Sequence, residues 1–274
     1  MPRMSRLGNA TLAATLTSGM MALGATTAHA RATRPLFEPT DLEMEESGVA
    51  EIDLQFGGIR SRPGPWRLVL PDFELDLGIL PNLEIDVDGA YAIEGPANGP
   101  FALDHAAPDS LWPSIKLGLF DQPSQGGGLA FALGVQAGPK LAVATGSHGL
   151  GFESLALLGI VRRRVHLALN VGGFADPAPD ATSPRPRGFE TGLDISVDLG
   201  SDGRFALTGE LSAVRFLSAD PAQLLATSGL TWSVLPFVDL SVVGVWGVLN
   251  GSDRYGVLFG ASPKMRLFGS SAKS

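Results

Sequence analysis

The sequence predicts an all-β protein, a transmembrane antiparallel β-barrel of about 12 strands. Three observations predict this fold. Apolar and polar residues alternate with a period of two in many short segments, which is the side-chain period of a strand. The connections between these segments are sorted into short and long ones, as in bacterial outer-membrane barrels. No window offers the roughly 18 uninterrupted apolar residues of a transmembrane helix, so only a closed barrel could cross a membrane.

The composition fits one large, turn-rich β domain. The chain has 274 residues, among them 35 glycines and 20 prolines, with 45% hydrophobic but only 18% charged residues. The absence of cysteine excludes a disulfide framework, a thiolate metal site and a cysteine nucleophile. The formal net charge of -8 argues against nucleic-acid binding.

The N-terminal residues have the pattern of a secretory signal peptide. Arg3 and Arg6 precede a mostly small and apolar run at residues 10–23, and an Ala-His-Ala sequence follows at 28–30. A basic start, an apolar centre and an A-x-A end are the three parts of such a peptide. We expect cleavage after Ala30.

The chain therefore divides into four predicted parts. Residues 1–30 are the signal peptide, and residues 31–47, which are polar and lack a clear period, form a periplasmic lead-in segment. The outer-membrane β-barrel spans 48–268, and residues 269–274 are a C-terminal tail. This organisation predicts location in the outer membrane of a Gram-negative cell.

The clearest element is a β-hairpin at residues 66–94. Its turn, at residues 80–82, contains a proline with fixed φ and an asparagine that tolerates the left-handed region. Each arm alternates apolar with acidic residues, so each has one apolar and one acidic face. The acidic residues of the two arms are Asp72, Glu74, Asp76, Glu84, Asp86 and Asp88.

The other predicted strands follow the same period less strongly. They are 49–56, 114–120, 129–136, 150–161, 165–171, 193–199, 204–213, 224–234, 238–248 and 255–268. Residues 95–113 and 139–149 are predicted as loops, and the connection after the seventh strand is long and rich in proline. The short connections predict periplasmic turns, and the long ones predict external loops.

Aromatic residues provide a second test, because such barrels place them in girdles at the two membrane interfaces. If the odd-numbered strands run outward, five aromatic residues fall near the external rim and two near the periplasmic rim. The external set is Trp66, Tyr91, Trp112, Trp246 and Tyr255, and the periplasmic set is Trp232 and Phe237.

The order of these features resembles the outer-membrane family named for the meta-pathway of phenol degradation, whose members are described as transporters. The matching parts are FELDLGILPNLEIDVDGAYAI, SIKLGLF, GPKLAVATGSHGLGFES and VHLALNVGG, and the resemblance covers most of the chain after the signal peptide. The chain departs from the family at Leu80-Pro81 and in the proline-rich loop after the seventh strand. The resemblance implies passage of small, often aromatic or apolar, compounds, and it supplies no catalytic residue.

The inward face of the first three strands is predicted to be strongly acidic. One hypothesis is a lumen lining that attracts cations. The other is that the carboxylates only hydrate the interior and pair with basic side chains across it, namely Lys116, Arg164, Arg204, Lys264 or Arg266. The predicted lumen lining is Glu51, Asp53, Asp72, Glu74, Asp76, Glu84, Asp86, Asp88, Lys116, His166 and Arg204.

There are two alternatives to a channel. One is an outer-membrane enzyme, such as a lipid-modifying hydrolase that uses serine and histidine, and the other is a non-conducting structural barrel. His105 and His148 lie in predicted loops, and His166 lies at an inward strand position. The sequence contains no G-x-S-x-G motif and no metal-ligand spacing. We therefore expect a channel or transporter for small molecules rather than an enzyme, without a cofactor or a metal. The expected partners are outer-membrane lipid, a small-molecule solute and the barrel-assembly machinery, but no nucleic acid.

Overall fold

The computed structural model describes most of the predicted barrel. The predicted signal peptide, residues 31–43 and the C-terminal tail lie outside the described residues. No helix in the described part of the chain is long and apolar enough to cross a membrane. The described residues are 44–60, 66–94, 106–122, 129–143, 146–178, 181–182, 184–200, 203–217 and 221–268.

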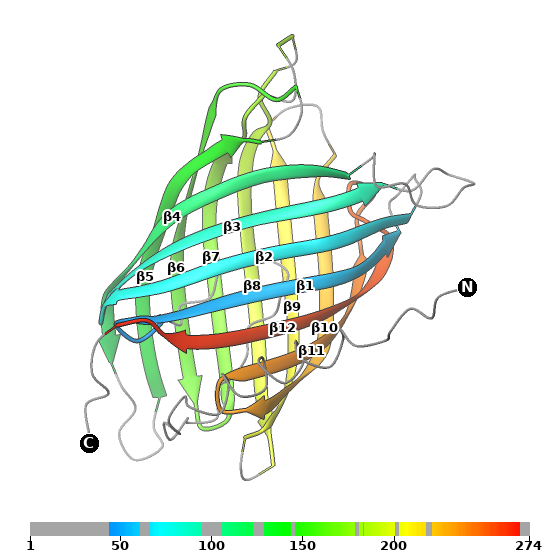
Figure 1. Cartoon of the computed structure of the whole chain (residues 1–274). Helices are drawn as coiled ribbons and strands as arrows, with labels where there is room; N and C mark the ends of the chain where they lie inside the picture. The colour runs from blue at the N-terminus through cyan, green and yellow to red at the C-terminus, as the bar shows by residue number, and fades with distance from the viewer. Residues whose placement is uncertain are drawn as a thin grey trace, which may run out of the picture.

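These residues form a closed antiparallel barrel of 12 strands, which confirms the predicted fold class. Every strand pairs with its neighbours in the sequence, and the first strand pairs with the last (Figure 1). The strands are β1 (Val49–Arg60), β2 (Trp66–Leu80), β3 (Leu83–Glu94), β4 (Ala106–Gln122), β5 (Leu129–Ala142), β6 (Leu150–Arg162), β7 (Val165–Ala175), β8 (Arg187–Leu199), β9 (Phe205–Phe216), β10 (Gln223–Leu235), β11 (Val238–Gly247) and β12 (Tyr255–Arg266).

Closure between β1 and β12 leaves the sheet without an edge. The pairing runs from Val49 opposite Arg266 to Arg60 opposite Tyr255. A closed sheet pairs its backbone donors and acceptors between strands, which is what a hydrocarbon environment requires. In Figure 1 the strands are strongly tilted, and β1 lies between β2 and β12.

The connections at the two rims differ, as the sequence predicts. At the rim where β1 begins and β12 ends, β2–β3, β6–β7 and β10–β11 are each joined by two residues. Arg163, in the β6–β7 turn, has a φ of 59°, a left-handed conformation that such tight turns need. The remaining two connections at this rim, β4–β5 and β8–β9, have six and five residues. The connections at the other rim have five to 11 residues, with residues 95–105 and 176–186 the longest. By analogy with outer-membrane barrels, we call these the periplasmic rim and the external rim.

Two predicted loops are wrong at their boundaries. Residues 106–113, predicted as loop, belong to β4, and residues 139–142 belong to β5. Prolines led to the incorrect boundaries, but the barrel accommodates them within its ladders. Pro108 lies opposite Tyr91, next to a register shift in the β3–β4 pairing, and Pro139 lies opposite Phe152. Prolines in sheets are typically placed at irregularities such as the one beside Pro108, where a ladder hydrogen bond is already missing.

The outer face of the barrel is apolar, and aromatic residues lie near its rims. Trp66 packs edge-to-face on Tyr255, with ring centroids 5.6 Å apart, and Trp246 lies opposite Tyr255. Near the periplasmic rim, Trp232 stacks on Phe205 at 5.9 Å. These aromatic residues lie where girdle residues are expected.

Trp112 is a correction, because it does not belong to the external girdle. Its side chain is only 6% exposed and lies inside the barrel, where Nε1 donates a hydrogen bond of 3.2 Å to the carbonyl oxygen of Gly138. Since β4 begins at Ala106, this tryptophan lies well inside the strand. It shares the inward parity of Ser114 and Lys116, both buried. The side chain of Tyr91 lies outside the described part of the structure.

Candidate functional site

The pairing of β1, β2 and β3 places carboxylates next to one another in two rows. Directly opposite residues on neighbouring strands have Cβ atoms about 4.5–5.5 Å apart, and like charges there repel each other. We call the residues of these rows the acidic wall. The first row is Glu51, Asp76 and Asp86, and the second row is Asp53, Glu74 and Asp88.

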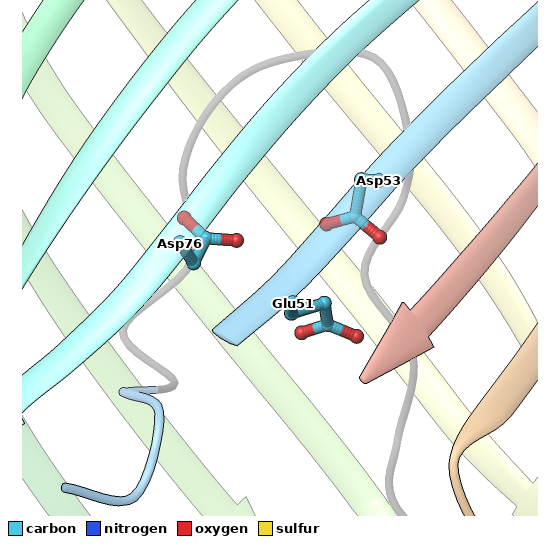
Figure 2. A group of neighbouring side chains, drawn as sticks. All are labelled: Glu51, Asp53 and Asp76. Atoms are coloured by element: carbon cyan, nitrogen blue, oxygen red, sulfur yellow. The ribbon is translucent and has the colours of Figure 1, made fainter. Parts of the chain in front are cut away.

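Four of the six residues of the acidic wall are buried inside the barrel, and Glu74 and Asp88 are partly buried. Asp76 and Asp86 are fully buried, and Glu51 and Asp53 are 5% exposed. Figure 2 shows the carboxylates of Glu51 and Asp53 from β1 and of Asp76 from β2 as close neighbours. Oxygens of these three groups lie within 4.8 Å of one another, as do oxygens of Glu74, Asp76 and Asp86. Carboxylate oxygens are the ligands that Ca²⁺ and Mg²⁺ prefer, so either group of three could hold a divalent cation.

Two lysines compensate part of this negative charge. Lys264 Nζ lies 3.1 Å from Glu51 Oε2 and 2.9 Å from Glu45 Oε1. Lys116 Nζ lies 2.7 Å from Glu84 Oε1, and both side chains of that pair are almost completely buried. A charge removed from water is costly unless it is paired and hydrogen-bonded, so these contacts stabilise the neighbouring carboxylates. Pairing of carboxylates with Lys116 and Lys264 agrees with the second of the two hypotheses from the sequence, in which basic side chains across the interior compensate the acidic ones.

Neutral donors complete the polar network on β4 and β5. Gln136 Nε2 donates hydrogen bonds of 2.8 Å to Asp86 Oδ2 and of 2.8 Å to Ser114 Oγ. All three residues are buried. The inner surface is therefore polar and hydrogen-bonded from the acidic wall across to β5.

The residues before β1 lie against the inner face of the barrel near the periplasmic rim. The backbone N–H of Glu45 donates to Glu84 Oε2, and the N–H of Gly48 donates to the Gly78 carbonyl at 2.7 Å. A Cβ atom at Gly78 would lie 2.4 Å from the carbonyl oxygens of Glu45 and Glu46, so only glycine allows this approach. We call residues 44–48 the strap. The last residues of the predicted periplasmic lead-in segment thus contact the barrel interior.

Apolar side chains occupy other parts of the inner face. Trp112, Leu155 and Leu157 form one buried cluster, which spans β4 to β6. Leu155 lies opposite Gln136 and Leu157 opposite Asn170, both buried polar residues, so these leucines point inward. A second cluster contains Ile59, Val69, Val245 and Leu258, with Leu225 packed against it. We call these the β6 cluster and the β1–β12 cluster.

Both clusters were missed by the sequence reasoning. Residues 154–161 of β6 are almost continuously apolar, and a run without alternation indicates that both faces of a strand meet apolar surroundings. That signal could have identified Leu155 and Leu157. Ile59 was predicted in a loop, because the predicted first strand ended at residue 56, but β1 continues to Arg60.

The remaining predicted lining residues have different positions. His166 Nε2 lies 3.5 Å from Asp198 Oδ2, and both side chains are partly buried. Asp72 is half-buried on β2, whereas Arg204 is exposed in the turn directly before β9. His148 is exposed, and its backbone pairs with Ala178. His105 lies outside the described residues.

The barrel does contain a serine, a histidine and an aspartate in proximity. Ser196 lies opposite His166 in the β7–β8 pairing, and Asp198 follows on the same strand. The hydroxyl of Ser196 is buried and makes no hydrogen bond to any described residue. Because a serine nucleophile is activated by a hydrogen bond to its base, this group lacks the contact that defines a hydrolytic triad.

Comparisons with solved structures place this architecture among outer-membrane barrels. The chain is similar to the NanC porin, with a TM-score of 0.57 and 10% identity over 78% of this chain and 100% of that one. It is similar to an outer-membrane channel from Pseudomonas putida F1, with a TM-score of 0.57 and 9% identity over 84% and 100%. The KdgM porin gives a TM-score of 0.50 and 8% identity over 78% and 98%. At sequence identities this low, the similarity shows only that the fold is shared. No protein-family model and no curated protein matches the sequence.

Proposed function

We propose that the protein is a channel of the bacterial outer membrane that passes small molecules. One observation carries this proposal: the 12-strand barrel is closed, with exposed apolar side chains on its outer face and buried charged and polar side chains on its inner face. This distribution is that of a barrel that meets lipid outside and water or solute inside. The shared fold with two porins and an outer-membrane channel supports the same role.

The inner surface supports a more specific proposal about the solute. The acidic wall favours cations over anions, because fixed carboxylates raise the local cation concentration. The β6 cluster and the β1–β12 cluster offer apolar surface inside the same barrel. We therefore propose that aromatic or apolar compounds are among the solutes, in agreement with the resemblance to the family named for phenol degradation.

Single-channel conductance in planar bilayers tests the cation preference. Under a salt gradient, the reversal potential should have the sign of a cation-selective channel, and its magnitude should fall as ionic strength rises, because charges are screened over about 10 Å at roughly 0.1 M salt. The variant to compare replaces Asp72, Glu74, Asp86 and Asp88 by Asn or Gln. Its reversal potential should move toward zero.

The matched control is Asp121→Asn, which removes a charge from an exposed position near the end of β4. It should leave the reversal potential unchanged. An unchanged potential in the fourfold variant, with the barrel still folded, would show that these four carboxylates do not set selectivity. A barrel that conducts none of the salts or organic solutes would contradict the channel proposal and favour a structural role.

The apolar part of the proposal has its own measurement. Aromatic acids and alkanes added to the open channel should block its current in a saturable way. Leu155→Asn together with Leu157→Asn keeps the side-chain size roughly constant but makes the β6 cluster polar, and block by aromatic solutes should weaken. Ser196→Ala, at a buried inward position outside the cluster, should not change block. If aromatic solutes blocked the Leu155→Asn, Leu157→Asn variant as strongly as the Ser196→Ala variant, the β6 cluster would not lie on the solute path.

A further inference from the structure

A groove lies on the outer face of the barrel near the external rim. It has a volume of about 350 Å³, and most of its lining belongs to β8, β9 and the start of β10. Phe189 is 59% exposed and Val171 53% exposed, so these side chains point away from the barrel interior. The apolar side chains of the lining are Val171, Phe189, Ala213, Val214, Ala222, Leu224 and Leu249.

The position of the groove along the strands is given by their ends. Val171 lies close to the end of β7, Phe189 to the start of β8, and Leu224 to the start of β10. These are the strand ends from which the long connections leave. The groove therefore faces the external part of the membrane.

Two arginines lie next to the groove. Arg215 lines it and is directly opposite Phe189 in the β8–β9 pairing. Arg187 precedes Phe189 by two residues, and its carbonyl accepts a hydrogen bond from the N–H of Leu217. Arg187 and Arg215 are thus diagonal neighbours on the outer face, and residues in this relation are typically about 7–8 Å apart at the backbone. Both are exposed, and neither makes an ion pair with a described residue.

Arginines at such positions need anionic surroundings or water. An arginine on the lipid face costs about 2–4 kcal/mol at the bilayer midplane and close to nothing near an interface. A single arginine at the rim could simply extend into water. Two arginines beside an apolar groove also provide the charge and the apolar surface that a phosphorylated lipid would contact together, because guanidinium groups bind phosphate through paired N–H donors.

We propose that this groove binds the phosphorylated glycolipid of the external leaflet, lipopolysaccharide. One of its acyl chains lies against Phe189, Ala213 and Leu224, and a phosphate of its lipid A moiety contacts Arg187 and Arg215. The proposal depends on the outer-membrane location proposed above. A volume of about 350 Å³ is within the roughly 300–1,000 Å³ of ordinary ligand sites, which suits part of a lipid rather than a whole one.

The test is a titration of the purified full chain in detergent with diphosphoryl lipid A, followed by native mass spectrometry. The wild type should bind, and Arg187→Gln with Arg215→Gln should weaken binding by roughly thirtyfold, since each of the two arginines near an anionic lipid surface contributes about 1 kcal/mol. The matched control, Arg163→Gln with Arg164→Gln, removes two charges from the periplasmic rim and should bind like the wild type. Unchanged binding in the first double variant would overturn the proposal.

A second variant tests the apolar part without changing charge. Ala213→Trp should fill the groove and weaken lipid binding, while a folded barrel still shows its normal heat-dependent shift in gel mobility. Inorganic phosphate at an equal concentration should not compete with lipid A. Full competition would identify a site for free anions and overturn the lipid assignment.

The two proposals can fail separately. Binding in detergent requires no conduction, and conductance is measured in bilayers without lipopolysaccharide. A barrel that conducts but binds lipid A and an unphosphorylated lipid equally well would refute only the proposal that the groove binds lipopolysaccharide. A barrel that binds lipid A specifically but conducts no current would refute only the channel proposal.

Discussion

The inner faces of β2 and β6 differ in polarity: that of β2 is acidic and that of β6 is apolar. On β2, inward Glu74 and Asp76 alternate with outward apolar residues such as Leu75. On β6, inward Leu155 and Leu157 alternate with residues that are also mostly apolar. A period of two is visible only where the two faces of a strand meet different surroundings. Alternation therefore predicts the acidic face of β2, whereas the β6 cluster could be recognised only from the almost continuous apolar run at residues 154–161.

The two walls are also stabilised in different ways. Buried ion pairs border the acidic wall, and that of Lys116 with Glu84 is the most enclosed of them. The β6 cluster depends on apolar packing among Trp112, Leu155 and Leu157. Removal of one partner from a buried ion pair leaves an uncompensated charge, whereas truncation of an apolar residue leaves only a cavity. The acidic wall should therefore be the more sensitive of the two to a single substitution.

The largest expected effect is that of Lys116→Met. This change leaves Glu84 buried without its cation and should lower the free energy of unfolding by about 3–5 kcal/mol. Urea-induced unfolding in lipid vesicles measures the loss. In the double variant with Glu84→Gln, most of the stability should return. A Lys116→Met variant as stable as the wild type would show that Glu84 is tolerated inside the barrel without its lysine.

A smaller loss is expected from an arginine on the outer face of β2. Leu75 is 38% exposed and outward, and Leu75→Arg should cost about 2–4 kcal/mol if the residue lies near the bilayer midplane. The matched control is Asp76→Asn, at the adjacent inward position, which should cost clearly less in the same vesicle assay. If both variants lost equal stability, the two faces of β2 would not meet different media.

The smallest expected effect among the three is that of Leu155→Ala. Loss of a buried leucine side chain typically costs 2–5 kcal/mol, and we expect about 2 kcal/mol because the lumen beside the β6 cluster leaves the neighbours room to move. The double variant with Trp112→Ala should show a coupling energy of at least about 0.5 kcal/mol, since the two residues are in contact. Strict additivity would mean that the cluster does not act as a packed unit.

Much of the barrel could be predicted from the sequence. The number of strands, the sorting of connections and the acidic face of the β2–β3 hairpin all follow from local alternation and turn residues. The two rows of the acidic wall could not be predicted, because they depend on register. The β1–β2 and β2–β3 pairings contain irregularities, and the one between Gly78 and Leu80, next to the β2–β3 turn, changes which carboxylates of the two strands lie opposite each other.

The contacts of Glu45 and the position of Trp112 could not be predicted for two other reasons. Glu45 lies in a segment without any period, and its partner Lys264 is 219 residues away in the sequence. Trp112 was assigned to the external girdle because it precedes the predicted fourth strand, which was expected to begin at residue 114. Tertiary pairing of β4 with β3 and β5 overrides that local signal.

The strap also affects the order in which the barrel can fold. Hairpins such as β2–β3 connect neighbouring residues and can form early, whereas β1–β12 pairing must close a loop that includes almost the whole barrel. The ion pairs of Lys264 with Glu45 and Glu51 join the same distant ends, so they cannot form before closure. Until that step, Glu51 lacks its lysine partner and must stay hydrated. Closure of the barrel and charge compensation at Glu51 are therefore a single late event.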